Sequence, residues 1–296
     1  MAEQVRASAA HSTDPVSKLL GIRRLTAIVD IGANPIDGDP PYKTMLQKGL
    51  CSVTGFEPQP AALATLNSKK GDRETYLPHV IGDGQDAVFR TCRAPGMSSL
   101  LIPDKPMLGH FCKFAEWGEV VQESPVSTRR LDDIEEISVM DFLKIDVQGS
   151  ELSIFHHGHE RLMQAVAVQT EVSFLSLYHD QPVLGEIDNE LRGLGFVPHA
   201  FAAINKRIIG PLFDVSNPYA ALNQLLEADI VYVRNFTKPD AMSNEQLTQL
   251  TMIAHHCYGS FDLALNCIHH LEKRKAIAPA SVDAYLRLIM QKGPPA

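Results

Sequence analysis

The stretch LTAIVDIGAN, residues 25–34, has the pattern of a buried strand that runs into a tight turn. Residues 27–29 are apolar on both faces of such a strand, which is typical of a central parallel strand covered by helices on each side. Asp30, Gly32 and Asn34 then cluster where the strand ends. Ligands of open α/β sheets bind outside the carboxyl ends of the strands, so we expect this turn to hold a cofactor.

Strand and helix patterns alternate along the rest of the chain, which favours a doubly wound α/β fold with a mostly parallel sheet. We expect a weakly ordered lead-in over residues 1–20, this α/β domain over 21–238 and a helical extension over 239–296. The extension contains three helical patterns, which we interpret as a surface for docking or for forming a homo-oligomer. Further strands are predicted at 50–56, 75–81, 141–146, 166–172, 197–203 and 229–234.

Composition narrows the class of protein. The net charge is −8 and no run is rich in Lys and Arg, which argues against a nucleic-acid-binding protein. No run reaches the ~18 apolar residues that a membrane span requires, and the first residues lack the apolar core of a signal peptide. The five cysteines form no CxxC pair, so we expect reduced thiols and a cytoplasmic location.

The second and third predicted strands also end in polar residues. Glu57 follows the strand at 50–56, and a carboxylate there can accept hydrogen bonds from both ribose hydroxyls of a nucleotide-like cofactor. The third strand ends at Asp83, which lies between two glycines, in a turn where the backbone can approach a planar ligand closely. Both positions are therefore candidates for cofactor binding.

Residues 87–126 interrupt the alternation with short β-like pieces rich in proline and glycine. We interpret them as an insertion that covers the site, with Phe111, Phe114 and Trp117 supplying apolar surface. A packed loop that meets no ligand accounts for the same pattern equally well.

Six short motifs follow one another in a fixed order between residues 25 and 235. Together, and above all through LKIDVQGSE, they resemble the FkbM family of S-adenosylmethionine-dependent methyltransferases. The chain departs from the family's first motif, because residues 35–37 intervene before the next glycine, Gly38. The motifs are Val29–Asn34, Gly55–Pro58, Ser98–Leu100, Arg130–Asp133, Leu143–Glu151 and Thr170–Phe174.

The resemblance implies S-adenosylmethionine as the cofactor and assigns residues to its parts. A hydrogen-bond acceptor near the adenine would meet its exocyclic amine, which is a donor. The methionine end would be held by Asp30, Gly32 and Asn34, the ribose hydroxyls by Glu57 with Pro58 beside it, and the adenine by Asp83.

Methyl transfer to a hydroxyl also requires removal of the hydroxyl proton. Asp146 and Glu171 end what we take to be adjacent strands, so one could act as general base, or both could bind a divalent metal that acidifies the acceptor. Lys144 would share the strand face of Asp146 and could pair with a carboxylate or orient the acceptor. His179 and Tyr178, in the loop after the fifth strand, are further candidates.

Simpler interpretations stand beside these. Acidic residues at strand ends are often helix caps or surface groups, and Glu151 has the position of a first-turn residue stabilised by the helix dipole. A nicotinamide-dependent oxidoreductase could use the same sheet, although the first turn lacks G-x-G-x-x-G. A non-catalytic scaffold is the third reading. The clustered acids speak against it, because like charges held together cost stability.

The expected activity is therefore O-methylation of a small-molecule or glycan acceptor, as the resemblance implies: a hydroxyl on a sugar, on a glycan or on a secondary metabolite. A divalent metal remains an open second requirement, and no nucleic-acid partner or membrane span is expected.

Overall fold

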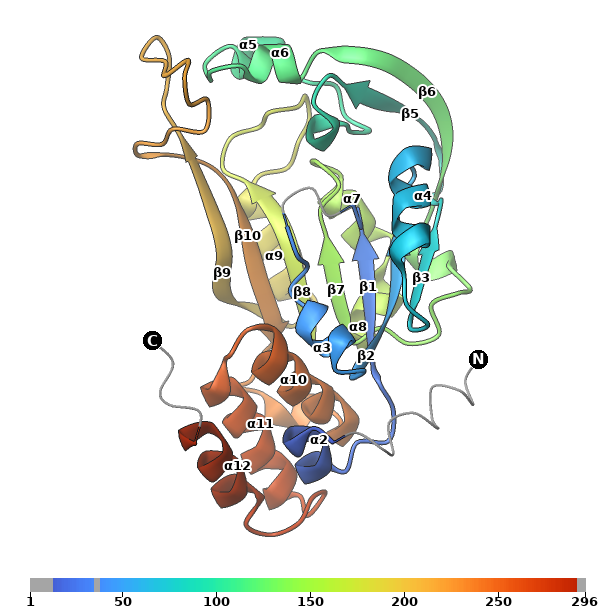
Figure 1. The fold of residues 1–296 in the computed structure, drawn as a ribbon, viewed down its shortest axis with the longest axis vertical. Helices are drawn as coiled ribbons and strands as arrows, with labels where there is room; N and C mark the ends of the chain where they lie inside the picture. The colour runs from blue at the N-terminus through green and yellow to red at the C-terminus, as the bar shows by residue number, and fades with distance from the viewer. Residues whose placement is uncertain (1–12, 35–37, 292–296) are drawn as a thin grey trace.

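A computed structural model of the chain describes residues 13–34 and 38–291. Its centre is a seven-stranded sheet of order β3-β2-β1-β7-β8-β10-β9, drawn in Figure 1. The strands from β3 to β8 run parallel, and β10 and β9 are antiparallel at one edge, so the prediction of a mostly parallel sheet is confirmed. The strands are β1 Thr26–Ile31, β2 Cys51–Phe56, β3 Glu74–Leu77, β7 Phe142–Ile145, β8 Ala167–Ser173, β9 Phe196–Arg207 and β10 Gln224–Arg234.

Helices cover both faces of this sheet, because alternate residues of each strand face opposite sides. In β1, Ile28 packs into the core beneath α3 and the C-terminal helices, whereas Val29 packs into the core beneath α7, α8 and α9. The longer helical segments are α2 Pro15–Leu20, α3 Lys43–Gln47, α4 Pro60–Lys69, α7 Glu151–His156, α8 His159–Gln164, α9 Leu184–Gly193, α10 Asn244–Cys257, α11 Phe261–Lys273 and α12 Ser281–Met290.

The register of the sheet places the candidate residues of different strands side by side. Asp30 of β1 is paired with Lys144 of β7, and Ile145 of β7 is paired with Thr170 of β8. The residues that follow this last pair are Asp146 and Glu171, which therefore lie beside each other on adjacent strands as expected. Asp146 directly follows β7, but Glu171 lies within β8, so the expectation that it ends its strand is wrong.

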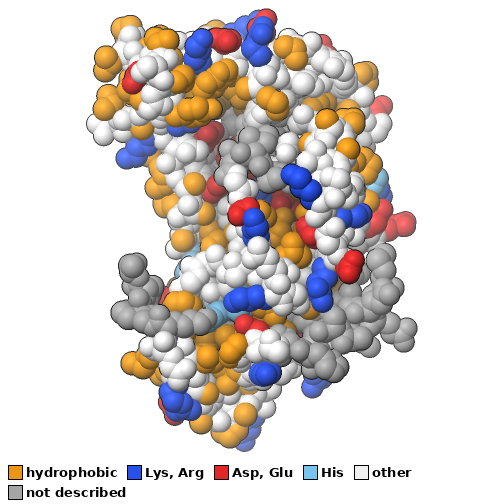
Figure 2. All heavy atoms as spheres, viewed as in Figure 1, with side chains coloured by type: hydrophobic (Ala, Val, Ile, Leu, Met, Phe, Trp, Pro, Cys, Tyr) orange, Lys and Arg blue, Asp and Glu red, His pale blue; other side chains and the backbone are white. Residues whose placement is uncertain are grey.

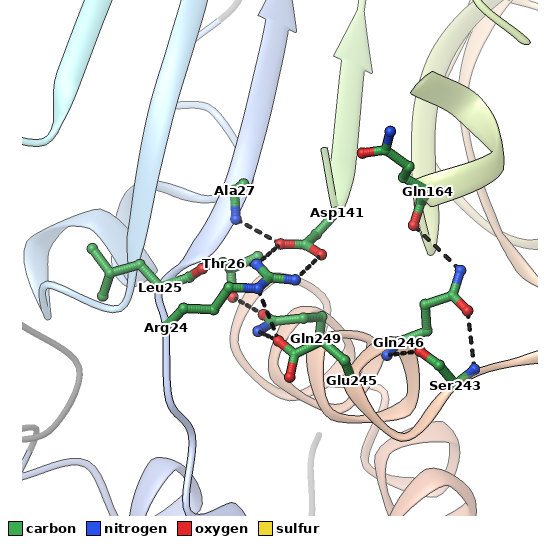
Figure 3. A network of polar contacts seen from close by, with 10 residues as sticks. All are labelled: Arg24, Leu25, Thr26, Ala27, Asp141, Gln164, Ser243, Glu245, Gln246 and Gln249. Atoms are coloured by element: carbon green, nitrogen blue, oxygen red, sulfur yellow. Dashed lines mark hydrogen bonds and ion pairs between the residues drawn. The ribbon is translucent and has the colours of Figure 1, made fainter. Parts of the chain in front are cut away.

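The three predicted C-terminal helices are present and pack against the chain's own sheet, below the amino ends of its strands (Figure 1). A polar network joins them to the sheet, as Figure 3 shows. Arg24 binds both carboxylate oxygens of Asp141, which also accepts the Ala27 backbone N–H at 2.8 Å. Thr26 donates to Gln249 of α10 at 2.7 Å. This end of the sheet is therefore closed by the extension itself.

The expected lead-in lies only partly within the described residues. Residues 1–12 lie outside the described residues, and Pro15–Leu20 forms helix α2, whose Val16 and Leu20 are buried against the C-terminal helices. Asp14 caps this helix by accepting the backbone N–H of Ser17 at 2.9 Å. None of the helices in 13–34 and 38–291 is long and apolar enough to cross a bilayer.

The strand expected at residues 75–81 is divided. Glu74–Leu77 forms β3 of the main sheet, whereas Val80–Ile81 forms β4 of a separate three-stranded sheet of order β4-β6-β5. Pro78 lies at the division and has no N–H to continue a ladder, which explains the break.

The insertion forms a cap above the carboxyl ends of the strands (Figure 1). Phe111 and Phe114 pack edge to face in a small core of the cap and are 3% and 6% exposed. Neither is among the described residues that line a cavity, so the packed-loop interpretation describes these two residues. The cap consists of β5 Asp86–Cys92, α5 Lys105–Leu108, α6 Phe114–Trp117 and β6 Val120–Arg129, with short 3₁₀ turns.

Candidate active site

A cavity opens between the carboxyl ends of β1, β2 and β7 and the cap. Residues of the cap that line it include Phe89, Pro95 and Ser98, so the insertion does contribute a wall to the site. Five residues of the predicted site also line this cavity: Gly32, Asn34, Glu57, Pro58 and Asp146.

The turn after β1 depends on the absence of a side chain at Gly32. Its φ is +78°, and a Cβ built there would lie 2.0 Å from the backbone carbonyl oxygen of Asp146. The Asp146 N–H in turn donates to the Ile31 carbonyl at 3.0 Å. The ends of β1 and β7 are therefore pressed together, and glycine is required for that close approach.

Glu57 lies at the floor of the cavity, directly after β2. It is 3% exposed, and its Oε1 accepts the backbone N–H of Gln59 at 2.8 Å, which fixes the carboxylate within its own turn. Burial raises the pKa of Glu57 above its ordinary value.

Asp146, Glu151 and Glu171 each offer an oxygen within 4.8 Å of the others. The side-chain amide of Gln148 joins two of them, because its Nε2 donates to Asp146 Oδ1 and to Glu171 Oε2, both at 2.9 Å. Gln148 adopts the left-handed conformation, with φ +57°. No role was predicted for Gln148, although it lies within the most specific motif.

Glu151 is the first residue of α7 and is 4% exposed. Its two carboxylate oxygens accept the backbone N–H groups of Val147 and Gly149 at 2.9 and 3.0 Å. Burial is the main cause that raises its pKa to about 7. The geometry agrees with the structural interpretation of this residue: it holds the turn between β7 and α7.

Glu171 lies within β8 and accepts a hydrogen bond from Gln148, which lines the cavity. Burial, and next the neighbouring Asp146 carboxylate, hold the pKa of Glu171 well above its ordinary value. Among the described residues, those that line the cavity include Asp146 but not Glu171. The two acids are thus adjacent but differ in their access to a ligand.

A second cavity of about 450 Å³ lies on the other side of the Gly32 turn and shares Asn34 and Asp146 with the first. Asp30 and Lys144 line it, with Lys144 Nζ 3.5 Å from Asp30 Oδ1 and 3.4 Å from the Gly32 carbonyl oxygen. The Tyr42 hydroxyl donates to the other oxygen of Asp30. Lys144 therefore pairs with a carboxylate, one of the two roles predicted for it.

Three other candidates lie apart from both cavities. Asp83 accepts hydrogen bonds from Gln85 and Thr128 and so stabilises its own turn. The His179 side chain is exposed, and its backbone N–H donates to Ile102. Tyr178 is buried, and its hydroxyl lies 3.3 Å from Gln148 Oε1, so it supports Gln148 from behind. None of the three is among the described residues that line either cavity.

Comparisons with solved structures find methyltransferases of low sequence identity. A magnesium protoporphyrin IX methyltransferase from Synechocystis PCC 6803 with bound SAM is 10% identical, with 74% of this chain and 76% of that chain covered and a TM-score of 0.37. A precorrin-6y C5,15-methyltransferase from Geobacter metallireducens is 12% identical, with 74% and 86% covered and a TM-score of 0.36. A search of curated proteins finds no match.

The family comparison is more specific. The model of the methyltransferase FkbM domain matches residues 30–198, a range that begins at the acid of the first turn and ends within β9. It therefore includes the whole of the cavity described above, the cap, Asp146 and Glu171. On this match the chain belongs to the FkbM methyltransferase family.

Proposed function

We propose that the chain transfers a methyl group from S-adenosylmethionine to a hydroxyl oxygen of a sugar, a glycan or a secondary metabolite. One observation carries the proposal: Glu57, the predicted ribose ligand, and Asp146, the predicted base, line the same cavity. S-adenosylmethionine supplies an electrophilic methyl group on a sulfonium sulfur. The residues of the chain have to align an acceptor with it and remove the acceptor's proton.

The described residues fit such a cofactor in two further respects. The Gly32 turn lets backbone, rather than a side chain, meet whatever occupies the space beside it. Asp30 Oδ1 is buried, lies 3.5 Å from Lys144 Nζ and has no hydrogen-bond partner among the described residues, which is costly unless a ligand supplies one. An α-ammonium group would be such a partner.

Asp146 is the better candidate for the general base. It lines the cavity, and Gln148 holds its carboxylate in place from one side. Glu171 has a raised pKa and is shielded by Gln148, so its proposed part is to position that amide. The cap would hold the acceptor, since Phe89 offers a ring face and Ser98 a hydroxyl, a combination that suits sugars.

A divalent metal at Asp146, Glu151 and Glu171 is the second means of deprotonation. It would have to displace the Gln148 amide and the backbone N–H groups that these carboxylates now accept. We therefore place the metal second, as a requirement that is tested rather than assumed.

Calorimetric titration tests the cofactor first. The purified protein is titrated with S-adenosylhomocysteine, with NADH and with NADPH, each in the presence of magnesium and in the presence of a chelator. Saturable binding of S-adenosylhomocysteine alone supports the proposal. Binding of a nicotinamide nucleotide instead would favour the oxidoreductase, and binding of none of the three would favour the scaffold.

The reaction is tested with a panel of hydroxyl-bearing acceptors, with formation of S-adenosylhomocysteine as the readout and mass spectrometry to locate the methyl group. For an acceptor that reacts, Asp146→Asn should lower kcat by about 100-fold or more, the usual contribution of a general base. The affinity for S-adenosylhomocysteine should stay close to that of the wild type. Transfer to nitrogen or carbon, or full activity of the variant, would contradict the assignment.

A further inference from the structure

The second cavity contains a buried pair of opposite charges, Asp30 and Lys144, and the function proposed above gives Lys144 no part. The side chain of Asp30 is 3% exposed and that of Lys144 is 18% exposed. Asp146 and Asp229 line the same space, and Gln169 contributes a side-chain amide from β8. In Figure 2, basic and acidic side chains lie close together around the hollowed middle of the face that carries α3 and α4.

Both members of the pair have unused hydrogen-bonding capacity. An ammonium group has three N–H donors, and the Lys144 ammonium makes one long hydrogen bond, to the Gly32 carbonyl at 3.4 Å, besides its ion pair with Asp30. Asp30 receives the Tyr42 hydroxyl on one oxygen, whereas Oδ1 has no hydrogen-bond partner within residues 13–34 and 38–291. If the two charges only neutralised each other, we would expect the ammonium and the carboxylate to form a direct hydrogen bond. An ion pair with poor geometry does not offset the cost of removing both charged groups from water.

The charges suit a zwitterion. A free α-amino acid end carries a carboxylate, which needs a cation, and an ammonium, which needs an anion, and both groups are bonded to the same carbon atom. Although burial opposes the charged form, the carboxylates of Asp30 and Asp146 hold the pKa of Lys144 above its ordinary value, so the cation persists at neutral pH.

The position suits the same ligand. Asn34 and Asp146 line both cavities, so the two spaces adjoin at these residues. A cofactor whose nucleoside lay beside Glu57 would direct its amino-acid end toward this boundary. We propose that Lys144 is a cofactor-binding residue that receives the α-carboxylate of the cofactor's amino-acid end, while Asp30 Oδ1 receives the α-ammonium. The inference rests on the proposed function, and it moves Lys144 from the catalytic set to the cofactor site.

The test compares two ligands that share the nucleoside and differ in the tail. S-adenosylhomocysteine has the amino-acid end, and methylthioadenosine lacks it. Lys144→Met should weaken the affinity for S-adenosylhomocysteine by about 10-fold to 100-fold, the range expected for one charged hydrogen bond. Its affinity for methylthioadenosine should change by less than about threefold. Affinities are measured by calorimetry, with displacement for the weaker ligand.

The control variant is Lys43→Met. Lys43 lies at the rim of the same cavity, where its ammonium pairs with Asp39 and its side chain is 45% exposed. The variant removes the same charge from the same region without breaking a buried contact, so the affinities for both ligands should change by less than about threefold. An equal loss for both ligands in Lys144→Met would mean a structural role for Lys144 and would overturn the inference.

If Lys144→Met fails to fold, as judged by circular dichroism, a comparison of two ligands on the wild-type protein still tests the inference. Decarboxylated S-adenosylhomocysteine retains the amine and lacks the carboxylate, so it should bind about 10-fold to 100-fold more weakly than the parent. Equal affinity would overturn the inference. Failure of the wild type to bind S-adenosylhomocysteine at all is a different result, since it contradicts the proposed function itself.

Discussion

Strand β7 has an aspartate at each end, and the fold treats the two differently. Asp141, before the strand, is 2% exposed and accepts two hydrogen bonds from Arg24 and one from the Ala27 backbone. Asp146, after the strand, faces a cavity and accepts one side-chain hydrogen bond, from Gln148. A saturated carboxylate holds elements together, whereas an unsaturated one retains capacity for a ligand.

The same contrast extends to the surroundings of each aspartate. At the amino ends of the strands, the polar groups drawn in Figure 3 satisfy one another, and α10 covers them. At the carboxyl ends, Asp30 Oδ1 has no hydrogen-bond partner in the part of the chain that the structure describes. Asp146 and Glu171 lie beside each other and are joined by the Gln148 amide. We infer that one end of the sheet is built for stability and that the other gives up stability to bind.

Asp141→Ala should have the largest effect on stability. The change leaves the Arg24 guanidinium without its buried partner and the Ala27 N–H without an acceptor, so the free energy of unfolding should fall by about 3–5 kcal/mol. Urea unfolding measures the loss. The matched change Asp146→Ala, at the other end of β7, removes the acceptor of one side-chain hydrogen bond at the wall of a cavity, so it should cost only about 1 kcal/mol or less. Equal destabilisation by both changes would remove the distinction between the two ends.

Gly32→Ala should be next in size. The added Cβ meets the Asp146 carbonyl at 2.0 Å in a left-handed residue, so we expect a loss of about 2–4 kcal/mol and of cofactor binding. Gly21 is the control, because its φ is +59° but a Cβ there has nothing within 4 Å. Gly21→Ala should therefore cost only about 1 kcal/mol, from the backbone conformation alone. A similar cost at both positions in thermal melts would argue against the close approach of β1 and β7.

The contrast between the ends was partly predictable from the sequence. The acids of the carboxyl ends follow apolar runs, and a run of alternating or continuous hydrophobicity fixes where a strand stops. The adjacency of Asp146 and Glu171 followed from the alternation of strands and helices, which specifies a parallel sheet. The end of a strand and the alternation of strands with helices are both set by residues close together in the sequence, so sequence patterns predict them.

The partners of those acids were not predictable. The pairing of Lys144 with Asp30 depends on the register between β1 and β7, and periodicity assigns a face to a residue but no neighbour across strands. Gln148 reaches two carboxylates because its backbone is left-handed, a conformation that a glutamine rarely adopts and that the sequence does not signal. Arg24 and Asp141 are 117 residues apart, and only the folded sheet brings them together.

Glu171→Gln should reveal the stability given up at the carboxyl ends, through its dependence on pH. The pKa of Glu171 is raised in the folded state, so the folded protein binds a proton more tightly than the unfolded chain does. Below the pKa that Glu171 has in the unfolded chain, it is protonated in both states and does not lower the free energy of unfolding. As pH rises through the pKa of the folded state, Glu171 ionises there and the loss of stability becomes complete. The variant lacks this titration, so its advantage should grow with pH, to about 1–2 kcal/mol at alkaline pH.

The measurement is urea unfolding of wild type and variant from pH 4 to pH 9. Glu57→Gln serves as a comparison, since the pKa of Glu57 is also raised by burial but its carboxylate faces the cavity and accepts a backbone N–H. A stability difference between Glu171→Gln and wild type that stays constant with pH would show that Glu171 carries no such penalty.

Tyr258→Phe should have the smallest effect, and it tests whether the two ends are independent. Tyr258 follows α10 of the extension, and its hydroxyl donates at 2.9 Å to Gln169 of β8, which lines the second cavity. Loss of this bond should lower the free energy of unfolding by about 1 kcal/mol. Tyr219→Phe is the control, because Tyr219 is 63% exposed and should tolerate the change within about 0.5 kcal/mol. If the amino ends of the strands stabilise the fold without affecting the cofactor site at the carboxyl ends, Tyr258→Phe should bind S-adenosylhomocysteine with an affinity within about threefold of the wild type. A larger loss of affinity at unchanged stability would mean that the C-terminal helices shape the cofactor site directly, through Gln169.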